Sequence, residues 1–154
     1  MATQNRNTMG GGDRGKFLEI GCVPDSTFEG ELDALKAAGT AIVGKLVSFT
    51  WSNNYEVTSP ASDAIFDGKI IQARESGTTW LLTVRVCSYI DQNSARHTPV
   101  GILNLPDNGG TIALQDSVIV YGTDYVYVDD GTSGGWGAVI AVDVPGSNYV
   151  DVIF

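Results

Sequence analysis

The only histidine of the chain, His97, is the first residue to consider for catalysis. A serine-histidine-acid triad would need it as the general base. The sequence contains no G-x-S-x-G turn that would present a nucleophilic serine. His97 stands in the stretch Ser94-Ala95-Arg96-His97-Thr98-Pro99, and a loop histidine beside arginine and proline is usually solvated surface. We therefore expect no catalytic residue and no enzyme.

Three aspartates, Asp124, Asp129 and Asp130, lie close together around a predicted turn. Neighbouring carboxylates at a turn can bind Ca²⁺ together with backbone carbonyls. Their spacing does not follow the calcium-loop pattern, and Asp-Asp-Gly is a common turn sequence. We expect no metal site. A small hydrolase that uses Asp129 and Asp130 stays open as an alternative, because the separation of paired acids depends on the fold.

Glycine-lysine pairs occur at three places, but none is a phosphate-binding loop. A Walker loop continues with serine or threonine, whereas phenylalanine, leucine and isoleucine follow Lys16, Lys45 and Lys69. One histidine and two distant cysteines are too few ligands for structural zinc, so we expect no cofactor. Cys22 and Cys87 lack C-x-x-C spacing and are interpreted as free thiols, although the sequence leaves their pairing open.

Aromatic residues are the remaining candidates for a binding site. Trp51 and Trp136 flank turn-rich segments, and Tyr125 and Tyr127 are spaced for one strand face. Such rings can stack on sugars, fill the end of a barrel or contact another subunit, since tyrosine is enriched in interface cores. We take Tyr125, Tyr127 and Trp136 as candidate interface aromatics, and a carbohydrate-binding role as the alternative.

The charge distribution argues against nucleic acid as a partner. The formal net charge is −9, and the last 58 residues carry seven aspartates and no lysine or arginine. Phosphate binding needs clustered basic side chains, which this half lacks. The chain also shows neither a signal-peptide pattern nor an apolar run of the ~20 residues that a membrane helix needs. We expect a soluble protein, made in a cytoplasm, that binds no membrane.

The elements that must position these residues begin with a polar, glycine-rich segment, residues 1–15. Such a composition cannot bury enough surface to offset its ordering entropy, so we expect a flexible N-terminal arm. The simplest interpretation is a mobile terminus. The alternative is an arm that orders on an acidic partner, for which Arg6, Arg14 and Lys16 are the candidate contact residues.

Residues 16–39 predict a short strand, Lys16–Ile20, followed by one helix. Ser26-Thr27-Phe28-Glu29 has the spacing of a capping box. Phe28, Leu32 and Leu35 then recur at helical intervals up to Gly39.

Residues 40–154 are dominated by short β-rich runs between glycine and asparagine turns, which predicts a barrel or sandwich. Several runs alternate with period two, which is typical of half-buried antiparallel strands. Three sets of residues are each predicted to share one strand face: Trp80, Leu82, Val84 and Val86; Trp136, Ala138, Ile140 and Val142; and Val150, Val152 and Phe154. The fold class is therefore all-β, an antiparallel barrel or sandwich with an extended N-terminal arm and one short helix. The predicted strands are Ala41–Thr50, Lys69–Ala73, Thr79–Ser88, Val100–Leu103, Thr111–Tyr121, Tyr125–Val128, Trp136–Asp143 and Tyr149–Phe154.

Four of these segments share a rhythm of glycine turns and valine-rich strands. They are Gly44-Lys45-Leu46-Val47-Ser48-Phe49, Asp67-Gly68-Lys69-Ile70-Ile71-Gln72-Ala73, Gly134–Asp143 and Tyr149–Phe154. Over residues 40–154 the chain resembles the small β-barrel capsid decoration, or cement, proteins of tailed bacteriophages.

The resemblance implies a structural role on the outer surface of an icosahedral shell. The implied partners are the major capsid protein and further copies of the chain, most often as a trimer, with arms that reach over coat subunits. Two other interpretations stay open: a carbohydrate- or receptor-binding module, as on a phage fibre, and the small hydrolase.

Overall fold

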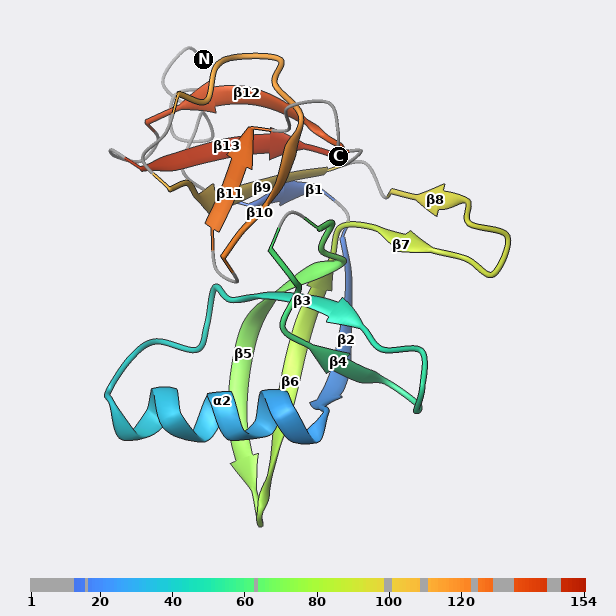
Figure 1. Ribbon diagram of the computed structural model, residues 1–154, viewed down its shortest axis with the longest axis vertical. Coiled ribbons are helices and arrows are strands. Elements are labelled where there is room, and N and C mark those ends of the chain that lie inside the picture. Colours follow the sequence, from blue (N-terminus) through green and yellow to red (C-terminus); the bar gives the residue numbers. More distant parts are fainter. Residues whose placement is uncertain are drawn as a thin grey trace, which may run out of the picture.

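The computed structural model places two β units one above the other (Figure 1). It describes residues 13–15, 17–62, 64–98, 101–108, 111–122, 125–128, 135–143 and 148–154. The lower unit is a five-stranded barrel with one helix. The upper unit is a four-stranded sheet with a two-stranded ribbon against it. The predicted all-β class with one short helix is confirmed.

The barrel strands follow the order β2-β4-β3-β5-β6 and close on themselves. All neighbours are antiparallel except β2 and β4, which run parallel and pair only at Val23 and Pro24. The bounds are β2 Leu18–Pro24, β3 Leu46–Phe49, β4 Glu56–Thr58, β5 Gly68–Ser76 and β6 Thr79–Val86.

Helix α2, Ser26–Ala37, connects β2 to β3 and covers one side of the barrel (Figure 1). It buries Phe28 and Leu32 completely in the barrel core. The predicted helix is confirmed, but its cap lies one residue earlier than the capping box suggested. Asp25 is the N-cap, because its Oδ1 accepts the Phe28 backbone N–H at 2.7 Å and so satisfies an orphan donor of the first turn.

The upper sheet is antiparallel with the order β1-β9-β13-β12. Its core contains Leu103 and Leu105 from β9 and Val150 and Val152 from β13, all fully buried. A ribbon of β10 and β11 and a hairpin of β7 and β8 complete the chain (Figure 1). The bounds are β1 Arg14–Gly15, β7 Tyr89–Ile90, β8 Arg96–His97, β9 Gly101–Pro106, β10 Val118–Tyr121, β11 Tyr125–Val128, β12 Ala138–Val142 and β13 Tyr149–Ile153.

The unit boundaries differ from those expected. Strand β2 and helix α2 belong to the barrel and are not a separate N-terminal segment. Residues 40–154 contribute to two hydrophobic clusters rather than one. The last residues of the predicted arm, Arg14 and Gly15, pair with β9 instead of being free. Residues 1–12 lie outside the described residues.

Individual strand predictions had mixed outcomes. The predicted shared face of Trp80, Leu82, Val84 and Val86 is confirmed and is buried, and so is that of Val150, Val152 and Phe154. In β12 the predicted face is only partly correct: Ile140 and Val142 share the exposed face, but Trp136 is buried together with Val139. Gly137, between Trp136 and Val139, has a left-handed backbone with φ of 73°. A left-handed residue interrupts the period-two alternation from which the face was predicted. Residues 111–117 form no strand, and β4, β7 and β8 were not predicted.

The two cysteines are both buried and unpaired. Burial raises the pKa of the Cys22 thiol to about 11 and that of Cys87 well above its usual value. Both thiols are therefore protonated at neutral pH and poor nucleophiles. Among the described residues, no helix has the length and apolar character required to span a bilayer.

Candidate functional site

The loop between β3 and β4, residues 50–55, projects two aromatic side chains into solvent. Trp51 is 66% exposed and Tyr55 is 67% exposed. Both have a left-handed backbone, with φ of 58° and 55°. A positive φ in a bulky residue is a true outlier that costs on the order of 1–3 kcal/mol. The fold thus holds two large rings out of its own cores at an energetic cost, which marks the loop as a candidate site.

The side chain of Glu56, the first residue of β4, holds this loop in place through hydrogen bonds. Its Oε1 accepts the Thr50 hydroxyl at 2.8 Å, and its Oε2 accepts the Asn53 side-chain amide at 2.9 Å. The Thr50 backbone N–H also donates to the Glu56 carbonyl at 3.1 Å. These bonds join both ends of the loop, and so restrict where the Trp51 ring can lie. The ring leans on Phe49, with centroids 5.1 Å apart.

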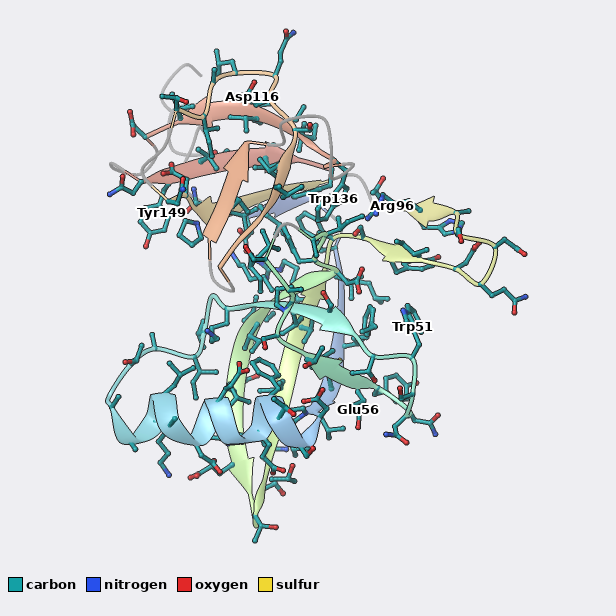
Figure 2. The ribbon with its side chains drawn as sticks, in the orientation of Figure 1. Trp51, Glu56, Arg96, Asp116, Trp136 and Tyr149 are labelled. Carbon is teal, nitrogen blue, oxygen red and sulfur yellow. The ribbon has the colours of Figure 1, made fainter. Side chains whose placement is uncertain are left out.

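A groove of about 570 Å³ lies between this loop and strands β2 and β6. Leu18, Ile20, Phe49 and Val86 form its apolar surface, and Trp51 and Tyr55 stand at its edge. Tyr89 of β7 borders it as well. Figure 2 shows Trp51 pointing away from the barrel, with Glu56 below it. A groove of this size, mostly apolar with a few polar groups, is typical of a binding site.

The polar groups that line the groove are one hydrogen-bonded carboxylate and several neutral side chains. Its only carboxylate, Glu56, is engaged by the loop through both oxygens. The other polar residues that line it are Ser52, Asn53 and Asn54, which are neutral hydrogen-bonding groups. A surface of exposed aromatic rings with neutral amides beside them suits a protein partner or a sugar.

His97 takes part in a small polar cluster on the β7–β8 hairpin. Its Nε2 lies 2.9 Å from Asp91 Oδ2, and its ring stacks on Tyr89 with centroids 4.8 Å apart. Asp91 also accepts the backbone N–H groups of Asn93 and Ala95. The His97 contact, with these two bonds, lowers the Asp91 pKa. The cluster shapes the turn between β7 and β8, and within the described residues no hydroxyl or thiol is bonded to His97.

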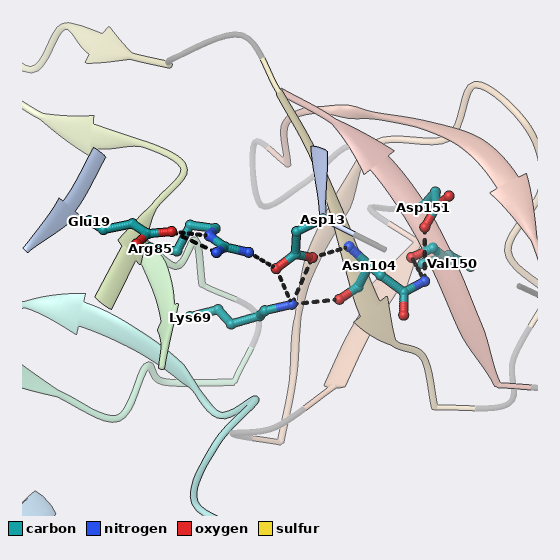
Figure 3. A network of polar contacts seen from close by, with 7 residues as sticks. All are labelled: Asp13, Glu19, Lys69, Arg85, Asn104, Val150 and Asp151. Carbon is teal, nitrogen blue, oxygen red and sulfur yellow. Dashed lines mark hydrogen bonds and ion pairs between the residues drawn. The ribbon is translucent and has the colours of Figure 1, made fainter. Parts of the chain in front are cut away.

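A second polar centre surrounds Asp13, where the chain passes from the upper sheet to the barrel (Figure 3). The Asp13 side chain is only 9% exposed. Its oxygens lie 2.7 Å from Lys69 Nζ and 2.5 Å from Arg85 Nη1, and Oδ1 accepts the Asn104 backbone N–H at 2.8 Å. Arg85 reaches Glu19 as well, at 2.6 Å. Asp13 thus ties barrel strands β5 and β6 to strand β9 of the upper sheet.

Within the chain, the predicted arm is attached through its only acidic residue, Asp13. The basic residues Arg6, Arg14 and Lys16 were predicted to contact a partner, which these internal contacts do not test. Arg6 and Lys16 lie outside the described residues, and only the backbone of Arg14 is described, in β1. Whether the basic residues contact a partner stays a prediction.

Trp136 is not available as an exposed aromatic, which corrects that part of the prediction. It is 8% exposed and packs between Phe66 and Phe154, with centroid distances of 4.8 Å and 5.6 Å. The Arg96 guanidinium lies 4.9 Å from the ring centroid, a cation–π contact; Figure 2 shows both residues where the two units meet. The ring therefore belongs to the core of the upper unit.

The other predicted residues have no described side chains. The backbones of Tyr125 and Tyr127 pair with β10 in the ribbon, so their role at an interface stays a prediction. Asp124, Asp129 and Asp130 lie outside the described residues, and in the part that is described no acid, histidine and cysteine cluster could hold a metal ion.

Sequence reasoning missed Tyr55 and Tyr89 and the contribution of Leu18 to this surface. The available signal was the run Trp51–Tyr55, where two aromatics enclose a Ser-Asn-Asn turn. Comparison with protein-family models, with characterised proteins and with solved structures found no match for the chain.

Proposed function

We propose that this chain is a structural decoration protein that binds the outside of an icosahedral phage shell as a homo-oligomer. It would contact the major capsid protein and add buried interface between coat subunits. The observation that carries the proposal is the aromatic loop, because strained backbone at Trp51 and Tyr55 keeps two large rings exposed. Rings of this kind are enriched at the energetic centres of protein interfaces.

The remaining features support a binding role of this type. The surface around the rings is apolar, with Leu18 and Tyr89 also exposed, and scattered neutral amides can complete hydrogen bonds at its rim. An oligomer would present several copies of the loop to the shell at once. Each further contact then becomes effectively intramolecular, which raises the overall affinity without new chemistry.

The test uses purified phage heads that lack their decoration protein. Wild-type chain should sediment with the heads and raise the temperature at which they rupture. Trp51→Ala should weaken attachment at least tenfold, since a central aromatic anchor contributes about 2 kcal/mol or more. Leu114→Ala is the matched control, because Leu114 is 59% exposed on the upper unit, away from the loop. Equal binding by both variants would contradict the role of the loop.

A size measurement tests the oligomeric part of the proposal. Light scattering of the purified chain should give three times the 16.3 kDa mass of one chain. A monomer that shows no affinity for heads would contradict the decoration role as a whole.

A carbohydrate-binding role is the second candidate, and one observation favours it. Trp51 and Tyr55 stand exposed beside Asn53 and Asn54, and stacking rings with neighbouring amides suit sugar recognition. Trp51, not the buried Trp136, would then be the stacking residue. Binding to a glycan array that disappears in Trp51→Ala, together with no binding to heads, would establish this role instead.

A further inference from the structure

Strand β2 has an unpaired edge beside the aromatic groove. On one side β2 pairs with β6 along Leu18–Cys22. On the other side it meets β4 only at Val23 and Pro24. Among the described strands, none pairs with residues 18–22 on that side. The barrel is therefore closed by a contact two residues long, and the rest of this edge borders the groove.

Backbone donors and acceptors line this edge. The Val23 N–H points toward β4, since it donates to the Tyr55 carbonyl at 2.9 Å. Alternate residues of a strand direct their N–H and C=O groups to the same side. The pairing of β2 with β6 is unbroken from Leu18 to Cys22, so the amides of Gly21 and Glu19 face the same side as that of Val23. Both residues are exposed, which leaves these groups open to a new partner.

A hollow lies on each face of the edge. The inner one is the aromatic groove, with Leu18 and Ile20 from β2. The outer one, about 430 Å³, contains Gly21 and Val23 from β2 and Arg74 from β5. Tyr55 borders both. Side chains of a strand point alternately to its two faces, so a strand laid against β2 would send them into the two hollows in turn.

The charges indicate which side chains fit. In the inner groove, Thr50 and Asn53 donate hydrogen bonds to the Glu56 carboxylate, and both donors are neutral. The negative charge of Glu56 therefore favours a lysine or arginine among the apolar residues of the bound segment. In the outer hollow Arg74 favours a carboxylate. An extended segment with apolar and basic residues on one face and polar or acidic residues on the other complements this edge.

We propose that the protein binds an extended segment of its protein partner as an added β-strand along the Leu18–Cys22 edge of β2. Main-chain hydrogen bonds to Glu19 and Gly21 hold the segment, and Trp51 and Tyr55 cover its inward side chains. This is recognition by strand addition, in which the backbone supplies affinity and the pockets supply specificity. The proposal rests on the decoration role above and names the mode of contact with the partner.

The first test uses a displayed library of random nine-residue linear peptides, selected on the full chain. Peptides of the predicted alternating pattern should be enriched. A selected peptide should bind Gly21→Ala within about twofold of wild type, because Ala keeps the N–H and a methyl at this position meets no atom within 4 Å. Gly21→Pro removes the N–H, which an edge strand tolerates, and should bind at least tenfold more weakly.

Hydrogen exchange of the wild-type chain with bound peptide tests the same contact and does not require that the proline variant folds. Peptide binding should slow exchange at the amides of Glu19 and Gly21, whereas those of Ile20 and Cys22, which face β6, should stay unchanged. Equal binding by Gly21→Pro, no protection at Glu19 and Gly21, or glycan binding without any selected peptide would each overturn the proposal.

Phage heads separate this proposal from the decoration role. If heads bind Gly21→Pro with the same affinity as the wild-type chain, strand addition is overturned and the decoration role stays intact. Heads that do not bind wild type, while peptides are captured at β2, would overturn the decoration role alone. An oligomer of the purified chain that dissociates in Gly21→Pro would show that a second copy occupies the edge, which also overturns the proposal.

Discussion

At the scale of single residues, the surroundings of Asp67 shift the pKa of its carboxyl group strongly. Asp67 lies just before β5, between the two β units, and its Oδ2 accepts the Phe49 backbone N–H at 2.8 Å. Its carbonyl accepts the N–H groups of Cys87 and Ser88. Burial raises the pKa of its side chain from 3.8 to about 6, although the Phe49 bond and the charge of Arg96 oppose the shift. Burial disfavours the ionised form, so at neutral pH this charge destabilises the fold.

The pH dependence of stability should show this effect. Between about pH 4 and pH 6 the unfolded chain loses the Asp67 proton before the folded chain does, so the contribution of Asp67 to stability falls as pH rises. The shift of about two pKa units corresponds to at most about 3 kcal/mol. Asp67→Asn keeps an acceptor for Phe49 and should match wild type near pH 4 but exceed it by up to that amount at pH 7.

Urea denaturation at pH 4, 5, 6 and 7 measures the difference. Asp116→Asn is the control for loss of one negative charge, because the Asp116 side chain accepts a local bond from the Ala113 backbone N–H, which Asn can also accept. Parallel stability profiles for wild type and Asp67→Asn would contradict the assignment.

At the scale of elements, β13 is the strand on which the upper unit depends. It lies between β9 and β12, and Val150, Asp151 and Val152 are fully buried. The buried Asp151 carboxylate accepts the Asn104 side-chain amide at 2.8 Å, which offsets part of its desolvation cost. At its end Phe154 exchanges two backbone hydrogen bonds with Gly101, at 2.9 Å and 3.3 Å.

Truncation of the last side chain should therefore be costly. Phe154→Ala removes a ring that packs on Phe66 and Trp136 and should lower the free energy of unfolding by about 3–5 kcal/mol. Ile153→Ala, one residue earlier on the exposed face, should cost less than about 1 kcal/mol. Chemical denaturation of both variants measures the contrast, and similar losses would show that the Phe154 ring is not part of the core.

At the scale of the whole molecule, two hydrophobic cores are joined by a polar network. The Asp13 carboxylate forms ion pairs with Lys69 and Arg85 of the barrel and accepts a hydrogen bond from the Asn104 backbone N–H of the upper sheet (Figure 3). Lys69 Nζ also donates to the Asn104 carbonyl at 3.1 Å. Because Asp13 is nearly buried, its removal leaves two half-buried cations without their shared anion.

The network should make a measurable contribution to stability. Asp13→Ala should cost about 2–4 kcal/mol, somewhat below a fully buried pair, since Arg85 keeps Glu19 and Lys69 keeps the Asn104 carbonyl. Lys36→Ala removes the exposed Lys36–Glu75 pair and should cost less than about 1 kcal/mol. Urea denaturation compares them, and equal losses would mean that Asp13 does not hold the two units together.

Structural features that depend on neighbouring residues in the sequence could be predicted without a structure. The helix at Ser26–Ala37 follows from the spacing of Phe28 and Leu32, and the buried face of β6 follows from the alternation of Trp80 through Val86. Local periodicity decides such features, because a regular helix or strand places its side chains at fixed angles. The all-β class and the free thiols could be predicted for the same reason, from composition and spacing.

Tertiary structure alone decided which residues form the candidate site. Trp51 and Trp136 both flank turns, yet one ring is exposed and the other is packed against Phe66. Strand β12 buries Val139 and exposes Ile140, and Asp13 contacts residues of β5, β6 and β9 that are more than 50 residues away. Such contacts depend on how distant segments pair, and the free edge of β2 exists because β4 pairs with it at only two residues. Sequence periodicity carries no information on strand order, since any inward-facing strand satisfies the same pattern.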